Sequence, residues 1–152
     1  MNQRIAKTSI VTALVVCFSA GAFAQQSPEE TAIKYRQGVM RVMSCNLMPM
    51  GAMVKGVKPF DKAIFARNAA RMEAVSTMPA EGFIPDSDLG ETKAKIDIWN
   101  KPDKFKGAME KMQKEVAKLA QVSKAGDEAA MKTQFGEVGK ACKGCHDDFQ
   151  KK

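Results

Sequence analysis

Apolar residues recur at alternating intervals of three and four along most of this 152-residue chain, and this spacing constrains the fold most. Such steps keep side chains on one side of an α-helix with about 3.6 residues per turn. Three segments carry the pattern, with Arg36 as the one charged member: Ile33, Arg36, Met40, Met43, Leu47 and Met50; Phe105, Met109, Met112, Val116 and Leu119; Met131, Phe135, Val138, Cys142, Cys145 and Phe149. The spacing predicts three helices that each bury one face.

Capping residues give the bounds of these helices and of a fourth with a weaker pattern. The first helix is predicted to begin at Ser27-Pro28 and to end at Gly56. The weaker helix starts at Asp61 and runs to about Thr77, with Ile64, Phe65, Met72 and Val75 as its apolar contacts. The remaining two run from Pro102 to Ala125, stopped by Gly126, and from Asp127 almost to the chain end.

The segment from Met78 to Lys101 is rich in proline and glycine and reads as an ordered loop with a short turn. Nowhere does the sequence alternate apolar and polar residues as a half-buried strand does. Four helices joined by mostly short loops predict an all-α fold, an antiparallel up-and-down four-helix bundle.

Residues 1–24 have the organisation of a secretory signal peptide. Arg4 and Lys7 precede an acid-free apolar run from Ile10 to Phe18, and Ala22-Phe23-Ala24 follows as a cleavage site. The run is short for a membrane span, which favours a cleaved leader over a membrane anchor. No membrane insertion of the mature chain is expected. A lipoprotein signal at Cys17 is disfavoured by the bulky Val16 before it. We therefore expect export to the periplasm and one mature domain, residues 25–152.

Without Arg4 and Lys7, 22 basic residues stand against 17 acidic ones, a formal charge of +5. The lysines are spread among acids and methionines, as on a solvated helix face. No stacking aromatics or known motif accompany them, so nucleic acid is not an expected partner. The excess positive charge favours encounter with acidic redox partner proteins.

The residues with the most specific chemistry are Cys142, Cys145 and His146, in the order Cys-Lys-Gly-Cys-His. On a helix their side chains lie at about 0°, 300° and 40°, and so share one face. Two thiols at this separation can add across the two vinyl groups of a haem, while the adjacent imidazole binds the iron. His146 is the only histidine of the chain, and covalent haem accounts for the odd cysteine number left after export.

Three other interpretations of this motif deserve comparison. A disulfide between Cys142 and Cys145 is disfavoured because thioredoxin-type pairs open a helix after a strand. A zinc site of Cys45, Cys142, Cys145 and His146 would have to place the adjacent residues 145 and 146 on one tetrahedral ion. A chance grouping of small core residues would leave the only histidine in the motif unexplained. Cys45 itself reads as a small side chain with no assigned role.

Taken with its flanks, this motif resembles that of the class II c-type cytochromes, in particular the cytochrome c′ family. The motif stands at the carboxyl end of the fourth helix, where class II proteins carry it. Similar flanking segments are Gln25 to Glu30, Tyr35-Arg36-Gln37, Val54 to Asp61 and Ile98-Trp99. The resemblance implies a four-helix bundle, usually a homodimer, with one covalent haem c between the helices and His146 as its axial iron ligand.

The resemblance also implies roles for residues outside the motif. Arg36 lies among the apolar residues that recur along the first helix, a row called here the seam of that helix. A buried guanidinium there needs an anion, and the family places it near a haem propionate. Gln37 lies beside it, and Glu91 and Thr92 match the family segment that lines the haem edge. The chain departs from many members at Gln150, where they carry Arg or Lys. This departure puts the proximal chemistry and the redox potential in doubt.

Met40 matches the position that faces the sixth coordination site of the iron. In cytochrome c′ proteins this side chain blocks the site and leaves five-coordinate, high-spin iron, whereas in low-spin relatives similar to cytochrome c-556 a methionine ligates the iron. A thioether can do either, or simply fill the core.

Three functions remain open on these grounds. The first is a periplasmic one-electron carrier with five-coordinate haem. The alternatives are a protein that binds nitric oxide or carbon monoxide, and a low-spin carrier with Met40 as sixth ligand. An enzyme such as a peroxidase is not expected, because the chain lacks a second imidazole for acid–base work.

Overall fold

The computed structural model describes residues 26–152, so the predicted leader, residues 1–24, lies outside the described part of the chain. Its elements, in order, are α1 (Pro28–Val54), α2 (Lys62–Val75), the 3₁₀ helix η1 (Met78–Gly82), α3 (Asp97–Asn100), α4 (Pro102–Ala125) and α5 (Glu128–Phe149). Four of them are long, and their bounds lie within about two residues of those predicted. The predicted antiparallel four-helix bundle is confirmed.

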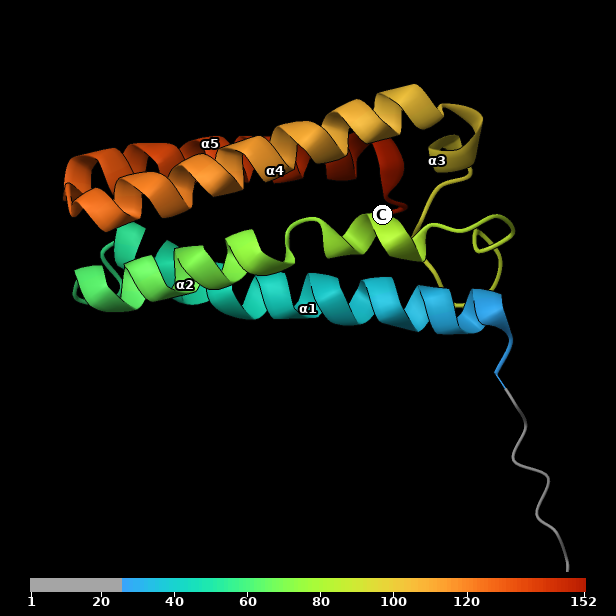
Figure 1. Cartoon of the computed structure of the whole chain (residues 1–152), viewed down its shortest axis with the longest axis horizontal. Helices are drawn as coiled ribbons and strands as arrows, with labels where there is room; N and C mark the ends of the chain where they lie inside the picture. The colour runs from blue at the N-terminus through green and yellow to red at the C-terminus, as the bar shows by residue number, and fades with distance from the viewer. Residues whose placement is uncertain (1–25) are drawn as a thin grey trace, which may run out of the picture.

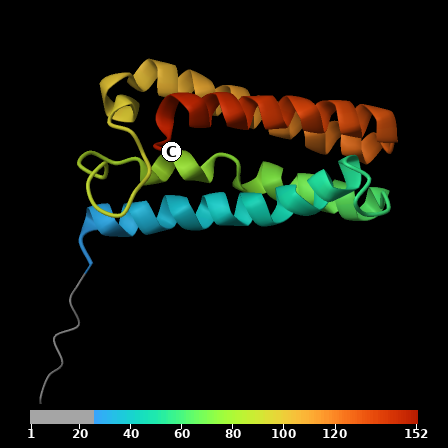
Figure 2. The same cartoon turned by 180° about the vertical axis from the view of Figure 1, so that it is seen from behind.

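The bundle has two layers, with α1 and α2 in one and α4 and α5 in the other (Figure 1). The same two layers are visible from behind (Figure 2). The segment between η1 and α4 wraps around one end of the bundle, and the C-terminus lies near this segment in both views. Among residues 26–152 the only β contact is an isolated bridge between Ala94 and Gln150.

Local capping explains where the long helices begin and end. Ser27 Oγ accepts a hydrogen bond from the backbone N–H of Glu30 at 3.2 Å, and Asp61 Oδ1 accepts one from Ile64 at 2.9 Å. Asp127 Oδ1 accepts from the first amides of α5. Gly126 ends α4 with φ of 78°, a left-handed conformation that favours glycine.

The segment predicted as one loop contains two short helices, η1 and α3. Gly82, at the end of η1, approaches α1 so closely that a Cβ there would lie 2.7 Å from the Cβ of Arg36 and 2.9 Å from the carbonyl of Ala32. At the far end of the segment, the indole N–H of Trp99 donates to the carbonyl of Ile84 at 2.9 Å. These contacts hold the segment against the bundle.

Methionine dominates the core. Seven of its fourteen buried residues are methionines: Met43, Met50, Met53, Met72, Met109, Met112 and Met131. The predicted seams face inward as expected, but several members are only half-buried, among them Met40, Leu47, Phe105, Cys142 and Cys145. These half-buried residues line one cavity.

Candidate functional site

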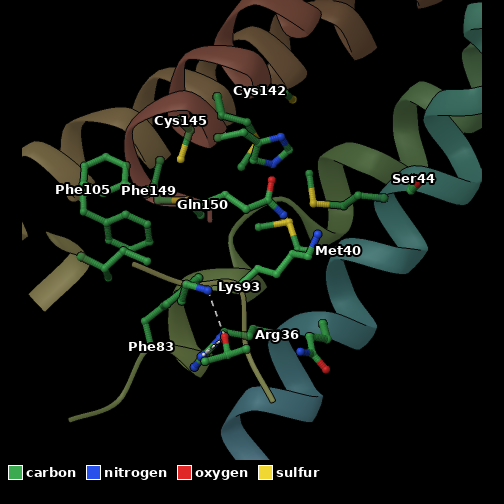
Figure 3. Close-up of a pocket in the computed structure, with 18 of the residues that line it drawn as sticks. Arg36, Met40, Ser44, Phe83, Lys93, Phe105, Cys142, Cys145, Phe149 and Gln150 are labelled. Atoms are coloured by element: carbon green, nitrogen blue, oxygen red, sulfur yellow. Dashed lines mark hydrogen bonds between the residues drawn. The ribbon is translucent and has the colours of Figure 1, made fainter. Parts of the chain in front are cut away.

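The Cys142-Lys143-Gly144-Cys145-His146 motif lies in the last two turns of α5 and borders a cavity of about 460 Å³. Side chains of Cys142, Cys145 and His146 all line it, as their positions on one helix face predict. The two cysteines lie across the cavity from Met40 of α1 (Figure 3). Its volume is in the range of about 300–1,000 Å³ that is usual for small-molecule and cofactor sites.

Most of the cavity wall is apolar. Methionines come from α1, α2 and α4, and aromatic rings come from the segment after η1, from α4 and from the end of α5. Leu47, Ala94 and Ile98 add aliphatic side chains, so the apolar wall consists of Met40, Met43, Leu47, Met72, Phe83, Ala94, Ile98, Phe105, Met109, Met112 and Phe149. Phe83, Phe105 and Phe149 pack edge to face, with ring centroids 4.8 and 5.3 Å apart along the series. Such a wall suits a large apolar group.

Arg36 closes one end of the cavity, and only 3% of its surface is exposed. Its Nη1 donates to the carbonyl of Gly82 at 2.6 Å and to Ser87 Oγ at 2.8 Å. Its Nη2 donates to the carbonyl of Ser87 at 2.6 Å and to Thr92 Oγ1 at 3.0 Å. The guanidinium also stacks on the Phe83 ring, 4.7 Å from its centroid.

The four hydrogen bonds of the Arg36 guanidinium go to uncharged acceptors of the loop. These bonds anchor the side chain without pairing its charge with a carboxylate. Burial lowers the pKa of Arg36, and the charge of Asp88 opposes this shift. A guanidinium is not deprotonated in proteins at neutral pH, so the side chain stays charged. Arg36 therefore holds the loop to α1 and brings a positive charge to the cavity.

The other predicted site residues on this side divide into two groups. Gln37 and Thr92 line the cavity, and so does Met40. Glu91 does not line it: its side chain is exposed, and its backbone carbonyl accepts a hydrogen bond from Gln37 Nε2 at 2.8 Å. Glu91 thus acts on the site through its backbone, by holding Gln37.

Phe83, Lys93 and Gln150 also reach the cavity, from the loop and from the end of the chain (Figure 3). Lys93 belongs to the loop, residues 90–93, that is similar to the family segment at the haem edge, so the resemblance indicated its place. Phe83 was not predicted as a lining residue, since no local spacing marks it. Arg36 and Lys93 are cations, and no carboxylate lines the cavity in the described part of the chain. The cavity is therefore suited to a ligand that carries negative groups.

Both motif thiols are disfavoured as thiolates. Burial raises the pKa of Cys142, and burial, with smaller contributions from Cys142 and Asp148, raises the pKa of Cys145 to about 11. Redox-active cysteines have a lowered pKa, because the thiolate is the nucleophile. The two thiols therefore lack the electrostatic setting of a thiol oxidoreductase.

Cys45 is not part of this site. It is exposed on α1 and does not line the cavity. Residues 26–152 contain no group of three or more His, Cys, Asp or Glu side chains placed to hold a metal ion. The alternative zinc site of Cys45, Cys142, Cys145 and His146 is therefore not assembled in this structure.

Two further observations bear on what kind of protein this is. None of the helices in residues 26–152 is both long and apolar enough to cross a membrane. Among the lining residues, His146 is the one with an imidazole side chain. The cavity therefore holds one side chain of that kind, and it belongs to the cysteine–histidine motif.

Comparisons of sequence and of structure with known proteins match one and the same family. The model of the family described as Cytochrome C' matches residues 31–150. Cytochrome c' of Halomonas halodenitrificans is 42% identical over 127 residues, which cover 80% of this chain and 96% of that protein. Cytochrome c prime from Shewanella frigidimarina superposes with a TM-score of 0.81 at 41% identity, over 84% of this chain and all of that one.

A further solved relative is recorded with a ligand. It is a nitric oxide complex of a single-residue variant of cytochrome c prime from Alcaligenes xylosoxidans, with a TM-score of 0.77 at 33% identity, over 84% of this chain and all of that one. Another variant of that protein is recorded with carbon monoxide bound.

Proposed function

Because the chain belongs to the cytochrome c′ family, whose members carry covalently bound haem c, we propose that it is a periplasmic one-electron carrier. The observation that carries the proposal is the cavity itself, in which Cys142, Cys145 and His146 share one wall. When bound, haem supplies a single-electron couple between ferric and ferrous iron.

The residues of the cavity fit this cofactor in shape and charge. The apolar wall of methionine and phenylalanine matches the porphyrin faces, and excludes water from them. Arg36 and Lys93 complement two propionate groups, and no carboxylate among the lining residues opposes them. The two thiols lie one helical turn apart on α5, on the face that borders the cavity.

Cys142 and Cys145 would hold the cofactor through two thioether bonds, each the product of adding one S–H across one vinyl group, with sulfur on one carbon and the proton on the other. The raised pKa values of the two thiols keep them protonated at neutral pH before attachment. His146, one residue after Cys145, would bind the iron through a ring nitrogen.

Arg36, Gln37 and Thr92 build the opposite, polar end of the site. The four hydrogen bonds of Arg36 to the loop leave its Nε–H and its charge for a haem propionate. The side chain of Gln37 donates a hydrogen bond to the carbonyl of Glu91, which fixes its position next to Arg36. We infer that these residues orient the cofactor, while the cysteines bind it.

Met40 decides the coordination of the iron, and we infer that it acts as a steric gate over five-coordinate, high-spin iron. Its side chain is half-buried and lies across the cavity from the cysteines (Figure 3). A thioether in this place fills space and adapts its shape easily. Met43, Met109 and Met112 also line the cavity, so thioether chemistry alone does not single out Met40 as a ligand.

Binding of nitric oxide or carbon monoxide is a second candidate function. It is favoured by the Alcaligenes relative, which is recorded with each of these gases. A gas needs a vacant coordination position beside Met40 and no acid–base group. Turnover of a substrate is not proposed, because His146, the one imidazole among the lining residues, is assigned to the iron and leaves none for acid–base catalysis.

Partners and assembly complete the proposal. The excess of basic residues in the mature chain favours acidic redox proteins as electron donors or acceptors. A homodimer is expected from the family resemblance, and sedimentation of the purified protein measures it directly.

Absorption spectra of the purified, exported protein test this function. We expect a high-spin spectrum in both redox states, and a shift when carbon monoxide is added to the dithionite-reduced protein. A low-spin spectrum that does not respond to carbon monoxide would show a sixth ligand from the protein, and its loss in Met40→Ala would identify Met40 as that ligand. A protein that does not cycle reversibly between ferric and ferrous states would contradict the electron-carrier function.

A further inference from the structure

A single lysine from the loop between η1 and α3 caps the carboxyl end of α5. The Nζ of Lys95 donates to the carbonyls of Asp147 at 2.9 Å and Asp148 at 3.1 Å. The backbone N–H of the same residue donates to the carbonyl of Phe149 at 2.9 Å. The last carbonyls of a helix have no partner within the helix, so Lys95 supplies three of the bonds that α5 lacks.

Neighbouring backbone contacts extend this cap into a short clasp, defined here as residues 93–95 against residues 149–151. Ala94 forms the β-bridge with Gln150, and the N–H of Lys151 donates to the carbonyl of Lys93 at 2.7 Å. Ala94 is buried, and Lys95 is half-buried although it is a lysine. The clasp joins the loop that lines the cavity to the end of the helix that carries His146.

The charges around the clasp show that Lys95 is directed to backbone and not to a carboxylate. The Asp148 carboxylate pairs with Lys104 at 3.0 Å, and the Asp147 carboxylate pairs with Lys143. The ammonium of Lys95 therefore lies at the negative end of the α5 dipole, where a cation is stabilising.

His146 depends on this cap because it lies in the final turn of α5. Its carbonyl accepts the N–H of Gln150 at 3.0 Å, the last bond of the helix. The histidine is exposed, and within residues 26–152 no hydrogen bond to its ring is seen. The position of the imidazole is therefore set by the backbone of the turn, and that turn is held by Lys95.

We propose that Lys95 is a positioning residue for the axial histidine. By donating hydrogen bonds to the carbonyls of the last turn, it fixes the backbone that carries His146, and so keeps the imidazole in one position and orientation at the cavity. This role rests on the proposed function, in which His146 binds the haem iron. Without the ammonium, the turn frays and the imidazole samples several orientations.

Three variants of the full-length, exported protein test the role. Lys95→Met removes the ammonium but keeps the stem and the backbone N–H. Lys95→Arg restores a cation with several donors, and Lys101→Met removes a cation of the same region whose partner, Asp97, is not on α5. The readouts are hydrogen exchange of the Gln150 and Lys151 amides, and the iron–histidine stretching band of the ferrous protein in resonance Raman spectra.

In Lys95→Met we expect exchange of these two amides to accelerate by about tenfold or more, since bonds to a charged donor are lost. The iron–histidine band should shift and broaden. Lys95→Arg should restore both readouts, and Lys101→Met should leave both unchanged. If Lys95→Met does not fold, Lys95→Gln replaces it, because the amide keeps a donor without the charge.

Unchanged exchange of these amides in Lys95→Met would overturn the proposal, since it would show that Lys95 does not stabilise the last turn of α5. Faster exchange with an unchanged iron–histidine band would also overturn it, because Lys95 would then stabilise the turn without positioning the ligand. If the unchanged protein has no haem, the proposed function fails and the positioning role fails with it. The exchange experiment still reports on the clasp in that case.

Discussion

The two ends of this bundle are built from the same helices but are filled differently. At the closed end, Met50, Phe65, Leu119, Met131 and Val138 are fully buried against one another. At the open end, five residues of the same helices are only half-buried and border a cavity of about 460 Å³: Met40, Leu47, Phe105, Cys142 and Cys145. A heptad pattern thus shows which side of a helix faces inward, but not whether protein or a ligand fills the interior.

The unequal lengths of the helices explain the difference. α1 has 27 residues and α2 only 14, so α2 covers about half of its neighbour. Beyond the end of α2, the place of the fourth helix of the bundle is taken by η1 and by the loop that Arg36 holds to α1. A loop with this anchoring leaves space beside α5 that a continuous helix would fill.

The largest expected effect comes from removing the attachment points at the open end. Replacing Cys142→Ser and Cys145→Ser together should abolish covalent haem, so the pigment is lost in denaturant. Loss of a ligand that binds only the folded state lowers stability. We expect the melting temperature to fall by about 10 °C or more, at several degrees per kcal/mol for a domain of this size. A variant that keeps its haem through denaturation would contradict the assignment.

A matched pair of methionine truncations compares the two ends directly. Met131→Ala at the closed end should cost about 2–5 kcal/mol in urea unfolding, because it leaves a cavity in a packed core. Met40→Ala at the open end should cost less than about 1.5 kcal/mol and should instead change carbon monoxide affinity or the spin state, because Met40 borders existing space. Equal costs at the two sites would show that the ends are packed alike.

The anchor of the loop gives the next effect. Arg36→Met should lower the free energy of unfolding by about 2 kcal/mol, since buried carbonyls of Gly82 and Ser87 lose their donor. Amides of residues 82–92 should exchange faster than those at the closed end, and the redox potential should fall with the loss of a cation. Arg36→Lys should restore the charge but not all four hydrogen bonds. If the loop stays protected in Arg36→Met, the anchor lies elsewhere.

The smallest effect is a pH dependence confined to the haem-free protein. The pKa of Cys145 is raised to about 11, above the ordinary value near 9, because burial disfavours the thiolate. The unfolded chain therefore loses its thiol proton before the folded one, so stability is full below pH 9 and falls as pH rises toward 11. Urea unfolding across this range measures the slope. It should shrink in Cys145→Ser and vanish in the haem-bearing protein, where a thioether cannot titrate.

The sequence predicted the parts of this structure that depend on local spacing. Caps such as Ser27, Asp61 and Asp127 and the three seams were sufficient for four helices and for the placement of Cys142, Cys145 and His146 on one face.

Contacts between distant segments could not be predicted in this way. Arg36 meets acceptors that lie 46 to 56 residues along the chain, and nothing in its own neighbourhood indicates that they are uncharged. The approach of Gly82 to α1 and the cap that Lys95 makes on α5 depend equally on how the loop folds back. Glu91 was expected at the haem edge by position, but the turn directs its side chain to solvent.

The intact mass of the exported protein tests the central claim most directly. The account predicts the mass of residues 25–152 plus one haem, retained under denaturing conditions. It would be contradicted by the mass of the bare polypeptide, or by that mass less two hydrogens, which would indicate a disulfide between Cys142 and Cys145 in place of the two thioether bonds.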